Sequence, residues 1–449
     1  MEKFFKLEEH KTDVRKEILA GVTTFLTMAY IIAVNPSILG ATGMEPGAIV
    51  TSTCLIAGLA TIFMGIYANL PFALASGMGL NAYFAYTVVI GMGEPWGVAL
   101  AAVFVEGIIF ILLSVTNLRE AVVNAIPLNL KYAVTAGIGL FIAFLGFIGA
   151  GVVINNDATL VSMGNLTAPT AIIAFVGIIV IVILYKKNIR GAILWGIVAS
   201  ALLSWGYALI SPEAAATYGI FLPQGIFKFE SMAPIAGKLD FSYLTDPSKI
   251  MSFVGVVFAF LFVDFFDTVG TLVGVASKAN MLDKDGKLPG AGKALMVDAV
   301  ATTVGAVAGV STVTTYVESS AGVAQGGRTG LTAVTTGVLF IIAMFFSPLF
   351  IAIPSCATAP ALIVVGFFMI ENIAKVNFSD FTEGVPAFLT MALMPLTYSI
   401  GDGLTIGILS YVYINLLSNV FSKEKKKVSV VMIVLGIIFT IKIIVTGMQ

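Results

Sequence analysis

The feature that most constrains this sequence is an apolar run of membrane-spanning length that recurs along the whole chain. Such runs repeat from one end of the 449 residues to the other, and a helix needs about 20 apolar residues to cross roughly 30 Å of hydrocarbon. Only 11% of the residues are charged, against about 25% in soluble proteins. The sequence therefore predicts a polytopic membrane protein. Its net charge of −1 gives no basic field for nucleic acid.

Fourteen segments are expected to cross the membrane, and two of them have interrupted patterns. The segments cover 17–37, 49–69, a broken 72–90, 96–116, 128–150, 169–186, 190–211, 250–276, 290–309, a broken 311–325, 330–351, 357–373, 383–399 and 402–421. A further apolar run at 428–446 could span the membrane or lie at its surface. The expected fold class is therefore an all-α polytopic membrane protein with extended backbone in segments 3 and 10.

Lysine and arginine indicate the orientation of the segments. With a cytoplasmic N-terminus, 20 of the 24 Lys and Arg residues fall at cytoplasmic ends. Lys228, Lys238 and Lys249 lie on the opposite side, and Lys442 lies in the last apolar run. Cytoplasmic loops of membrane proteins retain positive charge. We therefore expect a multi-pass protein of the inner (plasma) membrane with its N-terminus in the cytoplasm.

A long polar loop divides the chain into two halves of seven segments. Because seven is odd, the halves insert with opposite orientation, which is a common architecture of secondary transporters. The expected divisions are a cytoplasmic tail at 1–16, a first inverted repeat at 17–211, an extracytoplasmic loop at 212–249, a second repeat at 250–421, and a basic linker with the last apolar run at 422–449.

The two broken segments occupy matching places in the two halves. Residues 71–89 read PFALASGMGLNAYFAYTVV, and residues 309–327 read GVSTVTTYVESSAGVAQGG. Each opens with small or β-branched residues that suit extended backbone, then reaches a polar residue, Asn81 or Glu318. Interrupted helices at matching places mark the binding site of many transporters. The alternative is two ordinary helices weakened by glycine and threonine.

Carboxylates inside apolar segments are costly and are candidates for function. They are Glu106, Asp264, Asp267, Asp298, Glu318 and Asp402. No Lys, Arg or His lies in the middle of a segment, and the single histidine, His10, lies in the N-terminal tail. Any proton relay would therefore have to use carboxylates.

Asp264 and Asp267 are three residues apart, so a helix places both on one side. Two such carboxylates do not easily ionise together, so one could hold a proton or cation while the other binds substrate. Phe262, Phe265 and Phe266 could stack on a flat heterocycle, or face lipid as apolar filler. Which aspartate meets the substrate is left open by the pattern.

Glu318 and Asn81 are the strongest polar candidates for ligand contact. A carboxylate accepts two adjacent N–H groups on a purine edge, and an amide both donates and accepts. Glu318 could instead make a bond between helices. Ser319, beside Glu318, joins the candidates for substrate contact.

Asp298 fits a structural role better, because it could join segments 8 and 10 through Thr314 or Thr315. Thr271 and Thr315 join it as coupling or structural candidates.

Four stretches of the sequence resemble one transporter family. They are FFKLEEHKTDVRKEILAGVTTFLTMAYIIAVNPSIL, SGMGLNAYFAYTVV, FVDFFDTVGTLVG and TTYVESSAGVAQGGRTG. Together they resemble the adenine/guanine/hypoxanthine permeases, the azaguanine-like branch of the nucleobase–ascorbate transporter superfamily. The resemblance covers about residues 3 to 420.

The resemblance implies a fold of two inverted repeats divided into a core and a gate domain, with a short strand and a half-helix in segments 3 and 10. It implies that Glu318 binds the purine, that the segment-8 carboxylate is Asp267 with Asp264 as its rival, that Asn81 is the polar residue of segment 3, and that Asp298 is the buried acid of segment 9. It also implies proton coupling. The uracil and xanthine/urate branches often carry Asn or Gln where this chain has ESSAGV.

The expected function is therefore secondary uptake of adenine, guanine or hypoxanthine by proton symport, with no enzyme activity and no cofactor. The alternatives are Na⁺ coupling, an anion transporter of the same fold class, a channel, and an intramembrane aspartyl protease. The absence of a Walker sequence argues against ATP drive. Carriers of this kind often form homodimers through the gate, and no residue of the sequence bears on that.

Overall fold

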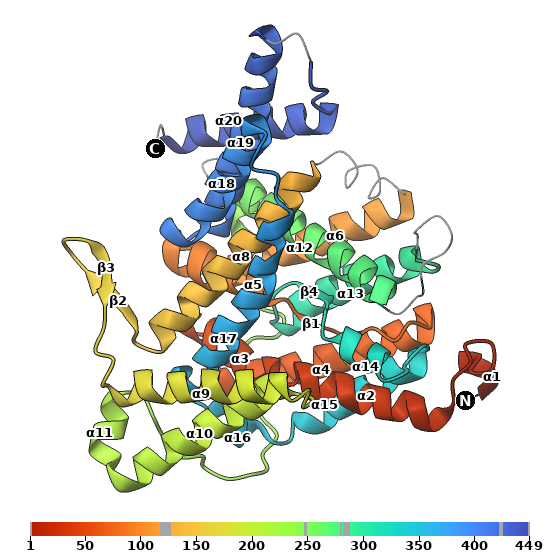
Figure 1. Cartoon of the computed structure of the whole chain (residues 1–449), viewed down its shortest axis with the longest axis vertical. Coiled ribbons are helices and arrows are strands. Elements are labelled where there is room, and N and C mark those ends of the chain that lie inside the picture. Colours follow the sequence, from red (N-terminus) through yellow and green to blue (C-terminus); the bar gives the residue numbers. More distant parts are fainter. Residues whose placement is uncertain are drawn as a thin grey trace.

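The chain folds almost entirely into helices, most of which lie side by side (Figure 1). The computed structural model describes residues 2–116, 127–246, 249–278, 281, 288–421 and 425–447, with some side chains within these ranges left out. The longer helices are α2 (Val14–Met28), α3 (Ile31–Leu39), α4 (Pro46–Phe63), α6 (Trp96–Thr116), α8 (Leu128–Gly149), α9 (Pro169–Lys186), α10 (Ala192–Ile210), α12 (Ile250–Lys278), α13 (Ala291–Ala308), α15 (Gly330–Ala343), α17 (Ser355–Ile370), α18 (Phe381–Leu396), α19 (Ile400–Phe421) and α20 (Val430–Gly447).

Nine of the described helical stretches are long and apolar enough to cross a membrane, and five shorter ones are also apolar. The chain is therefore a multi-pass membrane protein, as expected. The number of fourteen segments remains a prediction. One segment expected to be continuous is interrupted: α2 ends at Met28, residues 29 and 30 form a turn, and α3 begins at Ile31.

The two broken segments meet as a pair of short antiparallel strands. Strand β1 (Leu74–Ser76) pairs with β4 (Val313–Thr315), with Ala75 opposite Thr314. Helix α5 (Met78–Ala82) follows β1 and continues as a π-helix over Tyr83–Gly91, while α14 (Ser319–Ala324) follows β4. The extended backbone expected in segments 3 and 10 is confirmed.

Each of these strands is held by a threonine hydroxyl from the preceding helix. Thr61 on α4 accepts the N–H of Leu74 at 2.9 Å and donates to its carbonyl at 3.1 Å. Thr302 on α13 accepts the N–H of Val313 at 3.2 Å and donates to its carbonyl at 2.9 Å. Because buried backbone polar groups need partners, these hydroxyls make a strand tolerable at this depth.

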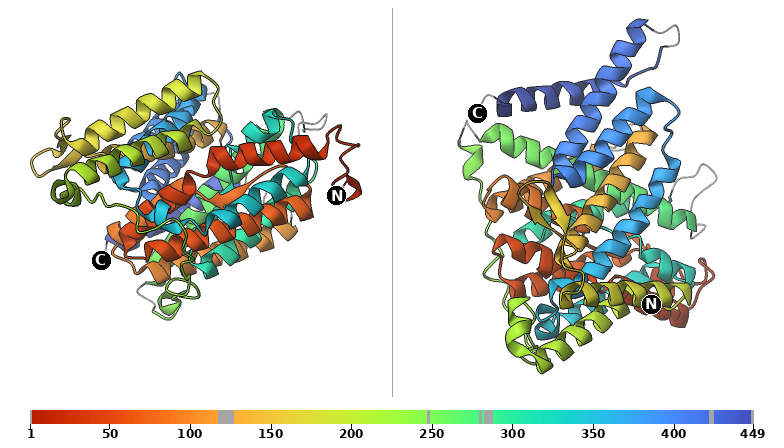
Figure 2. Two further views of the ribbon diagram at one scale, coloured as in Figure 1. Left: turned by 90° about the horizontal axis from the view of Figure 1, so that it is seen from below. Right: turned by 60° about the vertical axis from the view of Figure 1, so that its left-hand side comes forward.

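Glycines set the closest helix packing. Helix α4 and the π-helix Met64–Ala68 that continues it pack on α15 at two places seven residues apart, where Gly58 meets Gly337 and Gly65 meets Gly330. A Cβ on Gly330 would lie 1.9 Å from the Gly65 carbonyl oxygen. Helices α8 and α17 approach in the same way at Gly139 and Gly366. Small residues at such crossings let helix backbones touch inside a membrane. From below, α2, α4 and α15 form one group of helices, and α9 and α10 lie beside it (Figure 2).

Two features were not predicted from the sequence. Residues 153–163, expected as loop, form a hairpin of β2 (Val153–Asn156) and β3 (Leu160–Met163) that projects from the helices (Figure 1). The long loop also contains a short helix, α11 (Pro212–Thr217).

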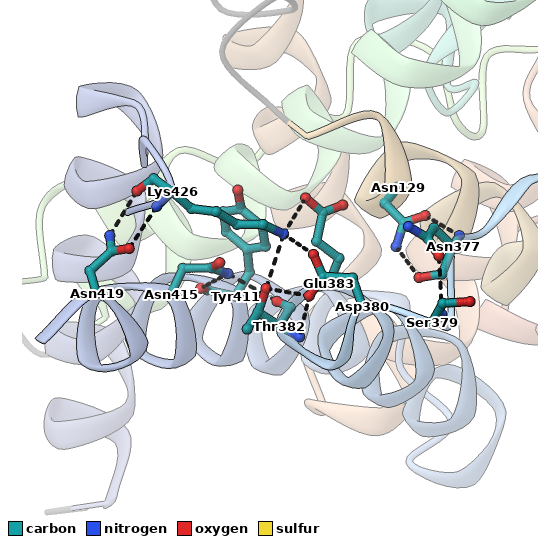
Figure 3. Close-up of polar contacts among 10 residues, drawn as sticks. All are labelled: Asn129, Asn377, Ser379, Asp380, Thr382, Glu383, Tyr411, Asn415, Asn419 and Lys426. Carbon is teal, nitrogen blue, oxygen red and sulfur yellow. Dashed lines mark hydrogen bonds and ion pairs between the residues drawn. The ribbon is translucent and has the colours of Figure 1, made fainter. Parts of the chain in front are cut away.

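The linker before α20 is anchored to α18 by Lys426 (Figure 3). Its ammonium group bonds the Asp380 carboxylate, the Thr382 hydroxyl at 3.0 Å and the Glu383 carboxylate at 3.1 Å. The Asn419 side chain on α19 holds the Lys426 backbone at both its N–H and its carbonyl, each at 2.7 Å. Helix α20 therefore starts from a fixed point on α18 and α19.

Candidate substrate-binding site

Glu318 lies between β4 and α14, where the broken segment changes from strand to helix. The residues of β4 are buried, but Val317 is 55% exposed and Glu318 is half-buried. The segment is therefore less buried at Val317 and Glu318 than along β4. The Tyr30 hydroxyl donates to Glu318 Oε1 at 2.5 Å, and the Thr27 hydroxyl donates to the Glu318 backbone carbonyl at 3.4 Å.

Asn81 lies on α5, the counterpart of α14, and its amide is engaged within the protein. Its Oδ1 accepts from the Ser76 hydroxyl at 2.5 Å, and its Nδ2 donates to Asn35 Oδ1 at 2.5 Å. Asn35 in turn donates to Thr53 at 2.7 Å. All four side chains are buried. Through these bonds Asn81 connects β1 and α5 to α3 and α4. Its contact with the polar edge of a substrate remains a prediction.

Asp264 and Asp298 converge on one hydroxyl. Thr268 Oγ1 lies 3.1 Å from Asp264 Oδ1, 3.1 and 3.2 Å from the two oxygens of Asp298, and 2.8 Å from the Thr314 hydroxyl. The residues come from α12, α13 and β4, and all are buried. Asp298 thus contacts Thr268 of segment 8, whose hydroxyl lies beside that of Thr314 in segment 10, and the role of Asp298 in joining these segments stays a prediction. The buried Thr315 hydroxyl has no hydrogen-bond partner among the described residues.

Glu106 approaches the same strand from α6. The Thr312 hydroxyl donates to Glu106 Oε2 at 2.8 Å, and both residues are buried. Thr312 lies just before β4 and Thr314 lies within it, so their hydroxyls connect this stretch to Glu106 and to the Asp264–Asp298 pair. Asp402 differs from these acids, because its side chain is exposed in the first turn of α19.

The remaining predicted site residues fall on the same elements. Phe262 is buried on α12, with its ring 6.2 Å from that of Phe258. Ser319 Oγ accepts the N–H of Ala73 at 3.0 Å and so fixes the start of β1. Thr271 is half-buried on α12. The side chains of Asp267, Phe265 and Phe266 lie outside the described part of the structure.

Sequence reasoning missed Tyr30, Asn35 and Thr268. Each is a polar side chain in an apolar run. In such a run no periodic pattern distinguishes a residue that lies near the site from one that packs in the core. The available signal was the Asn-Pro pair at residues 35–36, which marks a weak point in segment 1.

The fold and the carboxylates inside it define a polytopic membrane transporter. Solved structures agree on the fold: the transmembrane domain of the cyanobacterial bicarbonate transporter BicA matches with a TM-score of 0.65 and 15% identity, over 88% of this chain and 97% of that one.

Sequence comparison gives the family. A model of the Permease family matches residues 15–406. Adenine permease AdeP of Escherichia coli is 41% identical over 99% of this chain and 96% of its own length. Guanine/hypoxanthine permease PbuO of Bacillus subtilis is 43% identical over 91% of this chain and 93% of its own length. The chain belongs to the Permease family and is a transporter, not an enzyme.

Proposed function

We propose that this protein carries adenine, guanine and hypoxanthine into the cell by proton symport. The observation that supports it best is Glu318, a half-buried carboxylate between the strand and the half-helix of a broken membrane segment. Relatives over 40% identical along nearly the whole chain carry the names adenine permease and guanine/hypoxanthine permease. A purine is apolar on both faces and polar at its edge, so a few fixed polar groups in an apolar wall suit it.

Glu318 would accept N–H groups of the purine edge. Asp267 or Asp264 on α12 would supply the second carboxylate, and Phe262 and Phe266 a wall for the ring. Asn81 and Ser319 would hold β1 and β4 in place around the ligand, given their bonds to Ser76, Asn35 and Ala73.

The coupling proton would reside on the Asp264–Asp298 pair, in which case Asp267 would be the aspartate that meets the substrate. Thr268 has a single hydroxyl proton to donate, yet it lies 3.1 Å from both carboxylates. Two buried carboxylates that meet at one hydroxyl are favoured to share one proton. Asp298→Asn should therefore abolish uptake driven by a proton gradient while leaving exchange of labelled for unlabelled purine. Loss of both activities would mean that the pair serves structure or binding instead.

Transport would proceed by alternating access. A core domain of segments 1–4 and 8–11 would carry the site and move against a gate of segments 5–7 and 12–14. Support for two inverted repeats comes from the matching threonine clamps, Thr61 on Leu74 and Thr302 on Val313, which fall in segments 2 and 3 and in segments 9 and 10. The N-terminus would lie in the cytoplasm of a cell whose inner membrane holds the protein.

The test is uptake of radiolabelled adenine, guanine, hypoxanthine, uracil and sulfate into proteoliposomes, with and without an inward proton gradient. We expect gradient-dependent uptake of the purines alone, and its loss in Glu318→Ala. Glu94→Ala is the matched control. Glu94 also accepts a hydrogen bond from a tyrosine, Tyr243, but Tyr243 lies in the long loop and not in an expected membrane segment.

Two alternatives are separated by the same assay. Purine uptake driven by Na⁺ and indifferent to pH would change the coupling ion. Sulfate or bicarbonate uptake would favour an anion carrier, whose fold this chain shares. An anion site would favour positive groups, whereas the apolar segments here hold carboxylates.

A further inference from the structure

The Tyr30–Glu318 contact suggests how the binding carboxylate is held. Tyr30 occupies the turn between α2 and α3, is 1% exposed, and directs its hydroxyl to Glu318 Oε1. A helix interruption inside the membrane is tolerated where its backbone is buried in protein. The interruption thus places a tyrosine against Glu318, where the broken segment changes from strand to helix.

The two sides of this contact are packed together rigidly. Gly322 on α14 lies against α2, where an added Cβ would stand 2.0 Å from the Thr24 hydroxyl and 2.6 Å from the Ala20 carbonyl oxygen. The Thr27 hydroxyl adds a contact to the Glu318 backbone. Because no side chain fits between α2 and α14, Tyr30 and Glu318 should keep their relative positions whenever these helices move.

A hydrogen bond to one carboxylate oxygen restricts rotation of the whole group. With Oε1 held by Tyr30, rotation of the carboxylate is restricted, and Oε2 would be the oxygen that meets the ligand. Preorganised acceptors bind more tightly than mobile ones, since less side-chain freedom is lost on binding. Hydrogen bonds to charged groups are also among the stronger ones in proteins.

We propose that Tyr30 is a positioning residue for purine recognition, which stays bonded to Glu318 Oε1 and turns Oε2 toward the substrate. The inference rests on the proposed function of Glu318. In a competing role, the Tyr30 hydroxyl would bond the carboxylate only in the carrier without substrate, and purine would displace it on binding.

The test is the concentration dependence of purine uptake by Tyr30→Phe, which keeps the ring and removes the hydroxyl. We expect KM to rise about two- to tenfold, because the carboxylate of the variant loses side-chain freedom on binding, at about 0.5–1.5 kcal/mol for one immobilised side chain, with Vmax within about twofold of wild type. Tyr243→Phe is the control, because it removes a tyrosine–carboxylate bond of the same kind, to Glu94, which lies beyond the end of the broken segment 72–90 and not between its strand and half-helix. Its KM should equal that of wild type.

Three outcomes decide the proposal. An unchanged KM in Tyr30→Phe overturns it, and a lowered KM overturns it in favour of the competing role. A fall in Vmax alone would assign Tyr30 to the movement of the carrier rather than to binding, and would also overturn it.

Two further arrangements keep the test decisive. If Tyr30→Phe does not fold, as judged by its elution from size-exclusion chromatography, Tyr30→Met fills the space without a hydroxyl and is measured in its place. The proposed function fails separately, since it fails if wild type takes up no purine or if Glu318→Ala transports normally.

Discussion

Thr302 holds Val313 at both its backbone N–H and its carbonyl, through one hydroxyl. Thr61 does the same for Leu74 in the other half of the chain. The strands that separate the half-helices thus depend on two side chains that reach them from neighbouring helices.

Removal of the Thr302 hydroxyl should destabilise the protein. Thr302→Val keeps the shape but leaves a buried N–H and a carbonyl of Val313 without this partner, at a cost of about 1–3 kcal/mol for a buried group. We expect a fall of several degrees in the melting temperature of the detergent-solubilised protein. Thr335→Val is the control, because the Thr335 hydroxyl bonds only the Leu331 carbonyl of its own helix among the described contacts. Equal melting temperatures for the two variants would contradict the role given to Thr302.

The α4–α15 crossing should not accept a side chain. In Gly337→Ala the new methyl would lie 2.5 Å from the Gly58 carbonyl oxygen, and overpacking of this kind costs about 1–3 kcal/mol. Gly206→Ala on α10 is the matched control, because no described atom lies within 4 Å of its added methyl. We expect Gly337→Ala to melt lower than wild type and Gly206→Ala to melt at the same temperature or higher. The reverse order would rule out this packing.

The Lys426 anchor should be insensitive to pH in the neutral range. The hydrogen bond from Lys426 holds the pKa of the Asp380 carboxyl below its ordinary value of 3.8. Because the pKa of Asp380 is lower in the folded state, the contact is fully formed above pH 3.8 and is lost only as the pH falls through the lowered pKa. Hydrogen exchange of residues 425–435 should therefore follow only its intrinsic pH dependence between about pH 8 and pH 5.

Neutralising this lysine should loosen the start of α20. In Lys426→Met, exchange over 425–435 should become faster, although modestly, because a partly exposed ion pair contributes less than about 1 kcal/mol. The exposed neighbour Lys427→Met should exchange like wild type. Identical exchange in both variants would show that other contacts hold the linker.

Helix α20 should cross the membrane. Its 18 residues span about 27 Å, close to the hydrocarbon thickness. It packs on α12 and α19, with the Phe439 ring 5.4 Å from the Phe258 ring and Gly436 against Val412. Alkaline phosphatase, which is active only outside the cytoplasm, should therefore be active when fused to Gln449 and inactive when fused after Lys427. Activity at neither position would place α20 at the cytoplasmic surface.

Sequence reasoning anticipated the elements better than the contacts. Glycine, serine and threonine in 71–89 and 309–327 revealed both broken segments, because small and β-branched residues disfavour a continuous helix there. The break at residues 29–30 was hidden, since Ala29 and Tyr30 suit a helix, and only burial among other helices makes the turn tolerable.

The candidate site was predictable in its acids but not in their partners. The cost of a charge in hydrocarbon singles out Glu318, Asp264 and Asp298 in the sequence. A hydroxyl such as that of Thr268 carries no such cost, because it can bond its own helix. Its meeting with both aspartates depends on how α12, α13 and β4 pack, which the order of residues does not reveal.

The central claim is that Glu318 binds the purine, and equilibrium binding to purified protein tests it without the need for transport. Binding of radiolabelled hypoxanthine, guanine and adenine would be measured for wild type, Glu318→Gln and the control Glu94→Gln. We predict saturable binding by wild type and by Glu94→Gln, and affinity weakened about 10- to 100-fold in Glu318→Gln, since an amide replaces the charged acceptor. Wild-type affinity in Glu318→Gln would contradict the account.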